Sequence, residues 1–329
     1  MSYPDARPRR LRRSPLMRRA VRETSLTAEN LVLPLFVADA VAEPQPIESL
    51  PGHFHHGTES VIAECEEVIK LGIPMVLLFG LPAQKDEQGS AAWAADGAVQ
   101  EATRAIKARF GDQLIVATDL CLCEYTSHGH CGILSGENVD NDATLAAYAR
   151  VAVSQAEAGA DILAPSGMMD GQVGVIREAM EAAGHPDVVI MAYAAKMASA
   201  FYGPFRDAAD STPAFGDRRS YQMDGANLEE AVREAWLDIE EGADMVMVKP
   251  AGPYLDVIAA VAAESPVPVA AYQVSGEFAM LKAAADKGWL DYDAAVLESL
   301  VSIRRAGARL VISYLAKEAV RILGGPRES

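Results

Sequence analysis

Three of the four cysteines and two of the six histidines of this 329-residue sequence lie in twelve residues, LCLCEYTSHGHC, from Leu120 to Cys131. Thiolates are preferred zinc ligands, so this segment predicts a metal site. Structural zinc sites usually have four ligands, with cysteine pairs separated by two to four residues. Here one residue separates Cys121 from Cys123, and Cys131 follows a loop that contains Gly129. Three thiolates and an open fourth position favour a zinc ion that meets substrate or water.

The remaining histidines and the fourth cysteine leave alternatives open. His128 and His130 lie inside the cysteine segment. Each could be a further ligand or could hold a loop by hydrogen bonds, so a structural zinc completed by one of them stays an alternative. Cys65 falls in a predicted helix far away in the sequence and fits a small core residue. The HFHH stretch, residues 53–56, lies in a turn with proline and glycine, and we expect it at the non-catalytic end of the fold.

Two lysines follow apolar stretches in a way that indicates nucleophilic chemistry. Lys249 comes directly after MVMV, and Lys196 lies in the segment YAAKMASAFYGPF. Burial disfavours an ammonium group, so the pKa of such a lysine should fall from about 10.4 toward about 7 to 8. The free amine can then attack a carbonyl carbon and form a Schiff base. A lysine that reaches solvent or pairs with an acid is the simpler alternative, and two lysines on adjacent strand ends favour catalysis.

A long segment, residues 201–227, carries Arg206, Arg218 and Arg219 and has neither helical nor strand periodicity. Long irregular loops in compact domains are usually functional. Arginines on such a loop bind carboxylate or phosphate groups through paired hydrogen bonds. We therefore expect a lid that clamps an anionic substrate, with solvated arginines as the alternative.

Eight short apolar runs must position these residues: LVLPLFV (31–37), MVLLFG (75–80), LIVATDL (114–120), ILAPSG (162–167), VVIMAY (188–193), MVMVKP (245–250), VPVAAYQV (267–274) and LVISY (310–314). Their continuity suits strands buried on both faces. Segments with helical spacing lie between them, for example at 58–72, 143–160 and 227–242. This alternation predicts an α/β fold with a parallel sheet, and eight units in about 300 residues predict a (β/α)8 TIM barrel. A doubly wound open sheet is the alternative, but no GxGxxG motif follows the first run.

Active sites of such barrels lie at the carboxyl ends of the strands. Besides the cysteines and lysines, these positions hold Asp119, Ser166, Ser275 and Tyr314. We expect all of them to converge on one rim. Asp119 stands close to the cysteines and is a candidate to orient the metal site or to relay protons.

The formal net charge is −17, and its distribution is uneven. Residues 1–22 contain eight arginines and one acidic residue, so they carry +7 and the remainder carries −24. A basic arm on an acidic body favours contact with another copy of the chain over nucleic acid or a disordered tail. We predict a subunit-contact arm over residues 1–25 and one catalytic barrel over residues 26–329. With no secretory signal and no apolar run near the ~20 residues of a membrane span, we expect a cytoplasmic protein with no membrane partner.

Several segments together resemble one family, porphobilinogen synthase, also called delta-aminolevulinic acid dehydratase. The resemblance covers nearly the whole chain and rests on RLRRSPLMRRAVRET, DLCLCEYTSHGHCGIL, AKMASAFYGPFRDA, GDRRSYQMD, MVKPAGPYLD and AYQVSGEF. It implies a lyase of tetrapyrrole (heme) biosynthesis that condenses two molecules of 5-aminolevulinate to porphobilinogen and releases two waters. The family's usual assembly is a homo-octamer in which each N-terminal arm wraps a neighbour.

The resemblance also implies roles for residues: two Schiff-base lysines, three ligands of a catalytic Zn²⁺, two lid arginines that hold one substrate carboxylate, and a serine and a tyrosine that hold the other. In this order, the matching residues are Lys249 and Lys196; Cys121, Cys123 and Cys131; Arg206 and Arg218; and Ser275 and Tyr314. Glu234 matches a glutamate linked to an activating Mg²⁺ outside the active site in many bacterial members. The family's zinc-dependent branch has the three cysteines, so the chain resembles that branch. Ser220 stands where animal members have a cysteine for a second zinc, so no second zinc site is expected, and Ser220 with Glu124 favours the bacterial type.

Two other functions fit part of the pattern. A class I aldolase with a structural zinc needs only one reactive lysine and no second carboxylate site. A non-catalytic, metal-stabilised scaffold needs neither lysine. Both lysines and all four carboxylate-binding residues are present, which favours the condensing enzyme.

Overall fold

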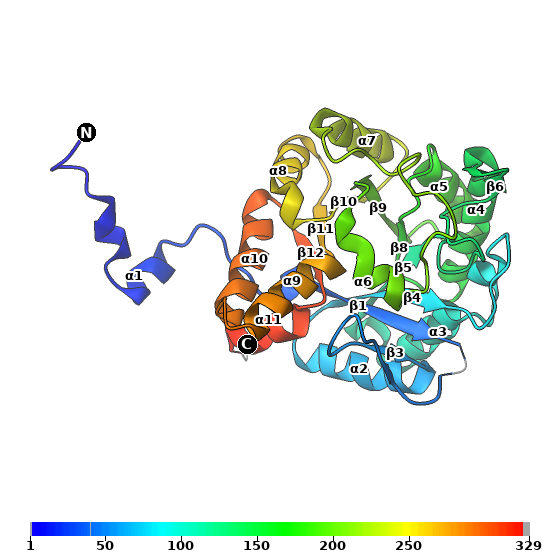
Figure 1. Ribbon diagram of the computed structural model, residues 1–329, viewed down its shortest axis with the longest axis horizontal. Coiled ribbons are helices and arrows are strands. Elements are labelled where there is room, and N and C mark those ends of the chain that lie inside the picture. Colours follow the sequence, from blue (N-terminus) through cyan, green and yellow to red (C-terminus); the bar gives the residue numbers. More distant parts are fainter. Residues whose placement is uncertain (1, 40, 325–329) are drawn as a thin grey trace.

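Eight parallel strands close into a barrel in the computed structural model, which describes residues 2–39 and 41–324 (Figure 1). The barrel strands are β1 (Leu31–Ala38), β4 (Met75–Leu81), β5 (Ile115–Leu120), β8 (Ile162–Pro165), β9 (Val189–Lys196), β10 (Met245–Lys249), β11 (Val269–Gln273) and β12 (Leu310–Ser313). Each pairs with the next, and β12 pairs with β1. The predicted (β/α)8 barrel is confirmed, and the closing pair excludes an open sheet.

Eight helices surround the strands and explain why the apolar runs are continuous. They are α2 (Thr58–Lys70), α3 (Ala98–Phe110), α4 (Asn141–Glu157), α5 (Gln172–Ala183), α7 (Leu228–Glu240), α8 (Leu255–Glu264), α10 (Tyr292–Ala306) and α11 (Ala316–Leu323). The strands are buried on both faces because helices cover the outside and side chains fill the inside. Seven of the eight residues of β1 are buried. Cys65 of α2 is fully buried, as expected for a core residue.

Further elements are added at the loops of the barrel. These are the pairs β2 (Gln45–Pro46) with β3 (Phe54–His56) and β6 (Leu134–Ser135) with β7 (Asn138–Val139), the helices α6 (Gly203–Ala208) and α9 (Ser275–Asp286), and short 3-10 turns at Ala28–Asn30, Ser90–Trp93, Gly111–Gln113, Ala200–Tyr202 and Gly252–Tyr254. The prediction that residues 201–227 are wholly irregular is therefore wrong for its first part. Pro204 occupies the first turn of α6, a position where the missing N–H costs no hydrogen bond.

The basic N-terminal segment extends away from the barrel (Figure 1). It contains a 3-10 turn (Pro8–Arg12) and α1 (Pro15–Ala20), which Ser14 caps by accepting a hydrogen bond from the Met17 amide. Leu16 is 68% exposed, so these turns have no apolar core of their own. Across the described residues, every helix is too short or too polar to cross a membrane.

Candidate active site

The two lysines lie side by side at the carboxyl ends of neighbouring strands. Lys249 ends β10, Lys196 ends β9, and the two are direct register partners. Both side chains are buried. The prediction that they meet at one rim is confirmed. The apolar run predicted as this strand ended at residue 193, whereas β9 continues to Lys196.

A β-bulge in β9 aims a tyrosine at both lysines. Ala192 pairs with Val246 and Ala195 pairs with Val248, so two residues of β9 oppose one residue of β10. In a regular strand, residues three apart face opposite sides, but the extra residue reverses this relation. The Tyr193 ring therefore lies 5.6 Å from Lys196 Nζ and 5.0 Å from Lys249 Nζ. Tyr193 could not be recognised as a site residue from the sequence, because nothing in the run 188–193 marks the bulge.

Lys249 is enclosed by aromatic rings. Its Nζ lies 4.4 Å from the ring centre of Tyr272, 5.0 Å from Tyr193, 5.1 Å from Phe205 and 5.4 Å from Tyr202. Burial, followed by the positive charge of Lys196, lowers the pKa of Lys249 to about 7. This matches the shift expected from the sequence. About half of the Lys249 side chains are therefore free amines at neutral pH.

Lys196 differs from its neighbour in its partners. Its Nζ donates a hydrogen bond to the carbonyl oxygen of Ser166. Burial acts to lower the pKa of Lys196, but the negative charge of the nearby cysteines outweighs burial and raises it above its usual value. Two adjacent lysines thus have opposite pKa shifts, so the site contains two chemically unlike amines.

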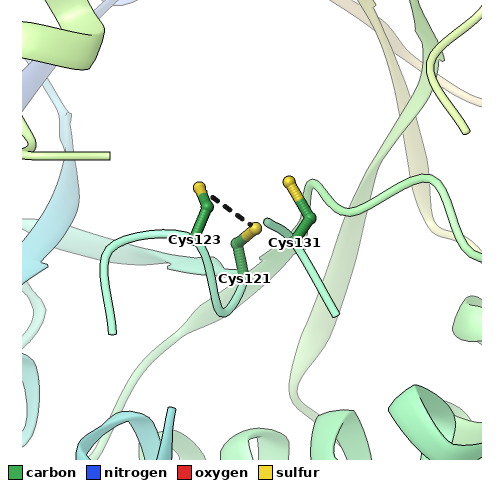
Figure 2. A group of neighbouring side chains, drawn as sticks. All are labelled: Cys121, Cys123 and Cys131. Carbon is green, nitrogen blue, oxygen red and sulfur yellow. Dashed lines mark hydrogen bonds between the residues drawn. The ribbon is translucent and has the colours of Figure 1, made fainter. Parts of the chain in front are cut away.

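The three cysteines of the predicted metal site converge (Figure 2). Their sulfur atoms lie within 4.8 Å of one another, and Cys121 Sγ is 3.5 Å from Cys123 Sγ. A tetrahedral zinc ion with bonds of about 2.3 Å places its sulfur ligands about 3.8 Å apart, so the spacing fits such an ion. Hydrogen bonds from Cys121 and Cys123 lower the pKa of the Cys131 thiol, which favours a thiolate there. Burial raises the pKa of Cys121, and the hydrogen bond with Cys121 raises that of Cys123. β5 ends at Leu120, so Cys121 and Cys123 lie in the turn that follows the strand.

His128 and His130 hold loops in the described structure. The Nδ1 atom of His128 accepts from the His130 amide at 3.1 Å, and its Nε2 lies 3.1 Å from the carbonyl oxygen of Glu87. His130 Nε2 lies 3.1 Å from the carbonyl oxygen of Phe215 in the lid. Of the two roles left open by the sequence, hydrogen bonding is the one these side chains have. The described groupings of metal-binding side chains contain neither histidine.

Two buried carboxyl groups adjoin the cysteines. Asp119 Oδ2 accepts from the Ser166 hydroxyl at 3.1 Å, whereas Oδ1 has no partner among the described residues. Burial, with a smaller effect of the charge on Glu124, raises the pKa of Asp119 to about 7. Glu124 is 3.2 Å from Cys123 Sγ, and its carboxylate, Asp119 and Cys121 form a second cluster that could hold a cation. Glu124 was not predicted as a site residue, although a charged residue inside a segment of buried metal ligands is a signal for one.

The lid arginines close the cavity over the lysines. Arg206 comes from α6, and Arg218 comes from the following loop. Burial, followed by the charge of Arg218, lowers the pKa of Arg206, and the Nε atoms of both lack a partner in the described part of the chain. An anion would satisfy such a pair. The free volume is ≈ 10 Å³, about that of one water, so α6 or the loop must move before substrate enters.

Ser275 and Tyr314 do not line this cavity. The Ser275 hydroxyl accepts from the Phe205 amide at 2.9 Å and donates to the Phe201 carbonyl oxygen at 3.4 Å. Tyr314 Oη accepts from the Tyr272 hydroxyl at 3.1 Å. Both residues therefore lie at the mouth of the barrel with their hydroxyl groups already hydrogen-bonded, Ser275 to the backbone in and before α6 and Tyr314 to a neighbouring tyrosine.

The HFHH stretch is placed differently from the prediction. Its last three residues form β3, and His55 pairs with Phe36 near the carboxyl end of β1, so the stretch lies at the catalytic mouth of the barrel. His55 Nε2 is 2.6 Å from the carbonyl oxygen of Ala208, the last residue of α6. The His53 ring packs edge-on against Tyr314, with centroids 5.2 Å apart. The prediction was wrong because it placed this turn, which precedes the first barrel helix, at the opposite end of the barrel.

Glu234 lies on α7, away from the lysines. It lines a separate surface cavity of ≈ 490 Å³ together with Asp170 and Glu230. Burial, followed by the charges of Asp170 and Glu230, raises the pKa of Glu234. Carboxylates that repel one another in this way would be stabilised by a cation.

The comparisons with known proteins agree with this geometry. The family model for delta-aminolevulinic acid dehydratase matches residues 5–322. The delta-aminolevulinic acid dehydratase of Streptomyces coelicolor is 55% identical over 325 residues, 98% of each chain. That of Mycobacterium tuberculosis is 54% identical over 321 residues, 97% of each chain. The Toxoplasma gondii enzyme, solved with its reaction product porphobilinogen, superimposes with a TM-score of 0.93 at 44% identity and covers 96% of this chain and 91% of its own.

Proposed function

The chain belongs to the delta-aminolevulinic acid dehydratase family, and we propose that Lys249 and Lys196 each bind one of the two 5-aminolevulinate molecules that it joins. The reaction forms porphobilinogen and releases two waters. The observation that carries the assignment is the register pairing of two buried lysines whose pKa values are shifted in opposite directions. An aldolase needs one such amine, whereas this condensation needs two carbonyl compounds that are held differently.

Lys249 holds the first substrate in this proposal. Its free amine attacks the keto carbon, the carbonyl oxygen leaves as water, and a Schiff base forms. The positive nitrogen of the protonated imine accepts electron density when a proton leaves the adjacent carbon, which then becomes the nucleophile. The carboxylate of this substrate would bind Ser275 and Tyr314 once α6 releases the Ser275 hydroxyl.

Lys196 holds the second substrate, and the lid arginines bind its carboxylate. Arg206 and Arg218 line the same cavity as both lysines, and each retains an unpartnered Nε in the described structure. A bound carboxylate would satisfy these groups and cancel their mutual repulsion. Because their carboxylates bind different residues, the two identical substrate molecules take different roles in the reaction.

Asp119 is the proton acceptor that the site offers between the two lysines and the cysteines. Its pKa of about 7 lets the carboxyl group take up and return a proton near neutral pH. Its unpartnered Oδ1 leaves one oxygen available for that exchange. Ser166 holds the other oxygen and also accepts from Lys196 through its carbonyl group.

We assign catalytic Zn²⁺ to Cys121, Cys123 and Cys131, because three buried, closely spaced sulfur atoms suit a soft divalent ion and leave one position open. When bound, the ion supplies a Lewis acid beside the second substrate.

An activating Mg²⁺ and an oligomer complete the proposal. The carboxylates of Asp170, Glu230 and Glu234 share one surface cavity, and oxygen ligands of this kind suit Mg²⁺. Residues 1–25 form an arm that contacts another copy in a homo-octamer, since the arm is basic and the rest of the chain is acidic. A cytoplasmic location is also part of the proposal, because the four cysteines are free thiols, as a reducing compartment keeps them.

The product assay tests the function directly. Purified protein given 5-aminolevulinate should form porphobilinogen, and a chelator should stop product formation. Borohydride added with substrate should attach substrate covalently to Lys249, identified by mass spectrometry of the digest. An active preparation without an adduct at Lys249 would contradict the lysine assignment, and a preparation that cleaves aldols but forms no porphobilinogen would favour the aldolase alternative.

A further inference from the structure

Two segments that are far apart in the sequence meet beside the cysteines. One is the metal loop, residues 121–131. The other is the lid strip, residues 209–217, which runs from the end of α6 to Arg218. The lid strip is mostly exposed and makes no strand or helix of its own. Its conformation therefore depends on what it contacts.

A continuous chain of hydrogen bonds joins a metal-loop cysteine to the lid strip. The Cys131 amide donates to Tyr221 Oη at 3.4 Å, Tyr221 Oη lies 3.1 Å from His130 Nδ1, and His130 Nε2 lies 3.1 Å from the carbonyl oxygen of Phe215. A carbonyl oxygen only accepts, so Nε2 of His130 donates. In the neutral ring Nδ1 then accepts from the Tyr221 hydroxyl, and that oxygen is left to accept from Cys131. Every group in the chain has the role its chemistry allows.

Backbone contacts reinforce the same connection. The Ala214 amide donates to the His128 carbonyl oxygen at 3.0 Å, and Arg218 donates to the Gly129 carbonyl oxygen at 2.8 Å. Gly129 has φ +70°, and a Cβ atom there would lie 2.5 Å from the carbonyl oxygen of Thr212. The lid strip therefore packs against the metal loop at backbone distance.

From this arrangement we infer that Tyr221 is a positioning residue that couples metal binding at the cysteines to closure of the lid strip. A bound ion fixes the Cys131 amide, which donates to the Tyr221 hydroxyl oxygen. Tyr221 in turn holds the His130 ring, whose Nε2 donates to the lid strip. By linkage, a closed lid strengthens ion binding by the same factor. The inference rests on the proposed metal site.

Tyr148 provides a matched comparison. This residue of α4 donates its hydroxyl to the carbonyl oxygen of Cys131 at 2.7 Å. It therefore supports the same cysteine as Tyr221, but from a barrel helix instead of the lid. Loss of either hydroxyl removes support for Cys131, and only loss of the Tyr221 hydroxyl breaks the connection to the lid strip.

The experiment compares Tyr221→Phe with Tyr148→Phe in the full chain. Zn²⁺ affinity is measured by competition with a chromogenic chelator, and lid closure by amide hydrogen exchange of residues 209–217 with saturating Zn²⁺ and after stripping. In the wild type, Zn²⁺ should slow exchange of the lid strip. Tyr221→Phe should weaken Zn²⁺ binding about fivefold, the effect of one hydrogen bond, and should reduce the protection that Zn²⁺ gives the lid. Tyr148→Phe should weaken binding and leave that protection intact at saturation.

Three results would overturn the coupling: a Tyr221→Phe protein identical to the wild type, one with weaker Zn²⁺ binding but full lid protection, or one with an altered lid but unchanged Zn²⁺ affinity. A wild type that binds no Zn²⁺ would instead refute the proposed metal site on which the coupling depends. His130→Gln breaks the same chain from the loop side and should give the same paired loss, so the test holds if Tyr221→Phe fails to fold.

Discussion

Lys249 should react as an amine whose pKa is about 7, and its pH profile distinguishes this from an ordinary lysine. With a pKa of about 7, the free-amine fraction is about 0.09 at pH 6 and about 0.9 at pH 8, a tenfold rise. With the usual pKa of about 10.4, the fraction grows about 100-fold over the same interval and is only about 0.0004 at pH 7. Burial beside a second cation therefore gives Lys249 about a thousandfold more free amine at neutral pH.

The assay follows Schiff-base formation with levulinate, a keto acid that has the substrate's carbonyl group but no amine with which to close a ring. Cyanoborohydride traps the imine, and the adduct at Lys249 is measured by mass spectrometry between pH 6 and pH 8. A small aliphatic amine in the same tube corrects for the pH dependence of the reductant. A 100-fold rise in the corrected rate would refute the burial argument.

Lys196→Met tests the second cause of the shift. Removing this positive charge should raise the pKa of Lys249 and move the trapping profile to higher pH. Lys287→Met, at the exposed end of α9, is the matched control and should leave the profile unchanged. An unchanged profile in Lys196→Met would show that burial alone sets the reactivity of Lys249.

Four further outcomes are expected. Stripping the metal should abolish turnover and leave the circular dichroism unchanged, because the cysteines lie at the mouth of a barrel with its own core; joint loss of both signals would indicate a structural ion. His55→Ala should raise the KM for 5-aminolevulinate about fivefold with little change in kcat, because it frees the end of α6 at Ala208; an equal effect of His185→Ala, at a distant loop, would contradict this. His53→Phe should flatten the pH dependence of the free energy of unfolding. Burial lowers the pKa of His53 from 6.5 to about 4, so the wild-type free energy of unfolding falls by up to about 1.4 kcal/mol per pH unit as the pH drops from 6.5 to 4. Equal slopes in the two proteins would rule out His53 as the cause. Deleting residues 1–22 should give smaller assemblies and weak activity that Mg²⁺ does not restore, as followed by sedimentation and activity across a Mg²⁺ titration; a large assembly with an intact Mg²⁺ response would refute the role of the arm.

The barrel and its reactive groups could be predicted from local sequence patterns. Strands buried on both faces must be apolar throughout, and helices between them must carry one apolar face. The alternation of strands and helices can therefore be predicted from short stretches of sequence. Lys249 could be recognised because a charged residue ending an apolar run must lie at a strand end. The cysteine segment could be recognised because three metal-binding side chains stand within eleven residues.

The contacts between distant segments could be seen only in the folded barrel. The bulge that aims Tyr193 at both lysines exists only as a register difference between β9 and β10. The Ser275 hydroxyl binds the backbone at the start of α6, and His55 reaches Ala208, about 150 residues away in sequence. Tyr221 meets Cys131 across 90 residues. Local periodicity reports whether a side chain is buried, whereas the partner that it finds depends on barrel closure and strand register, which no single segment encodes.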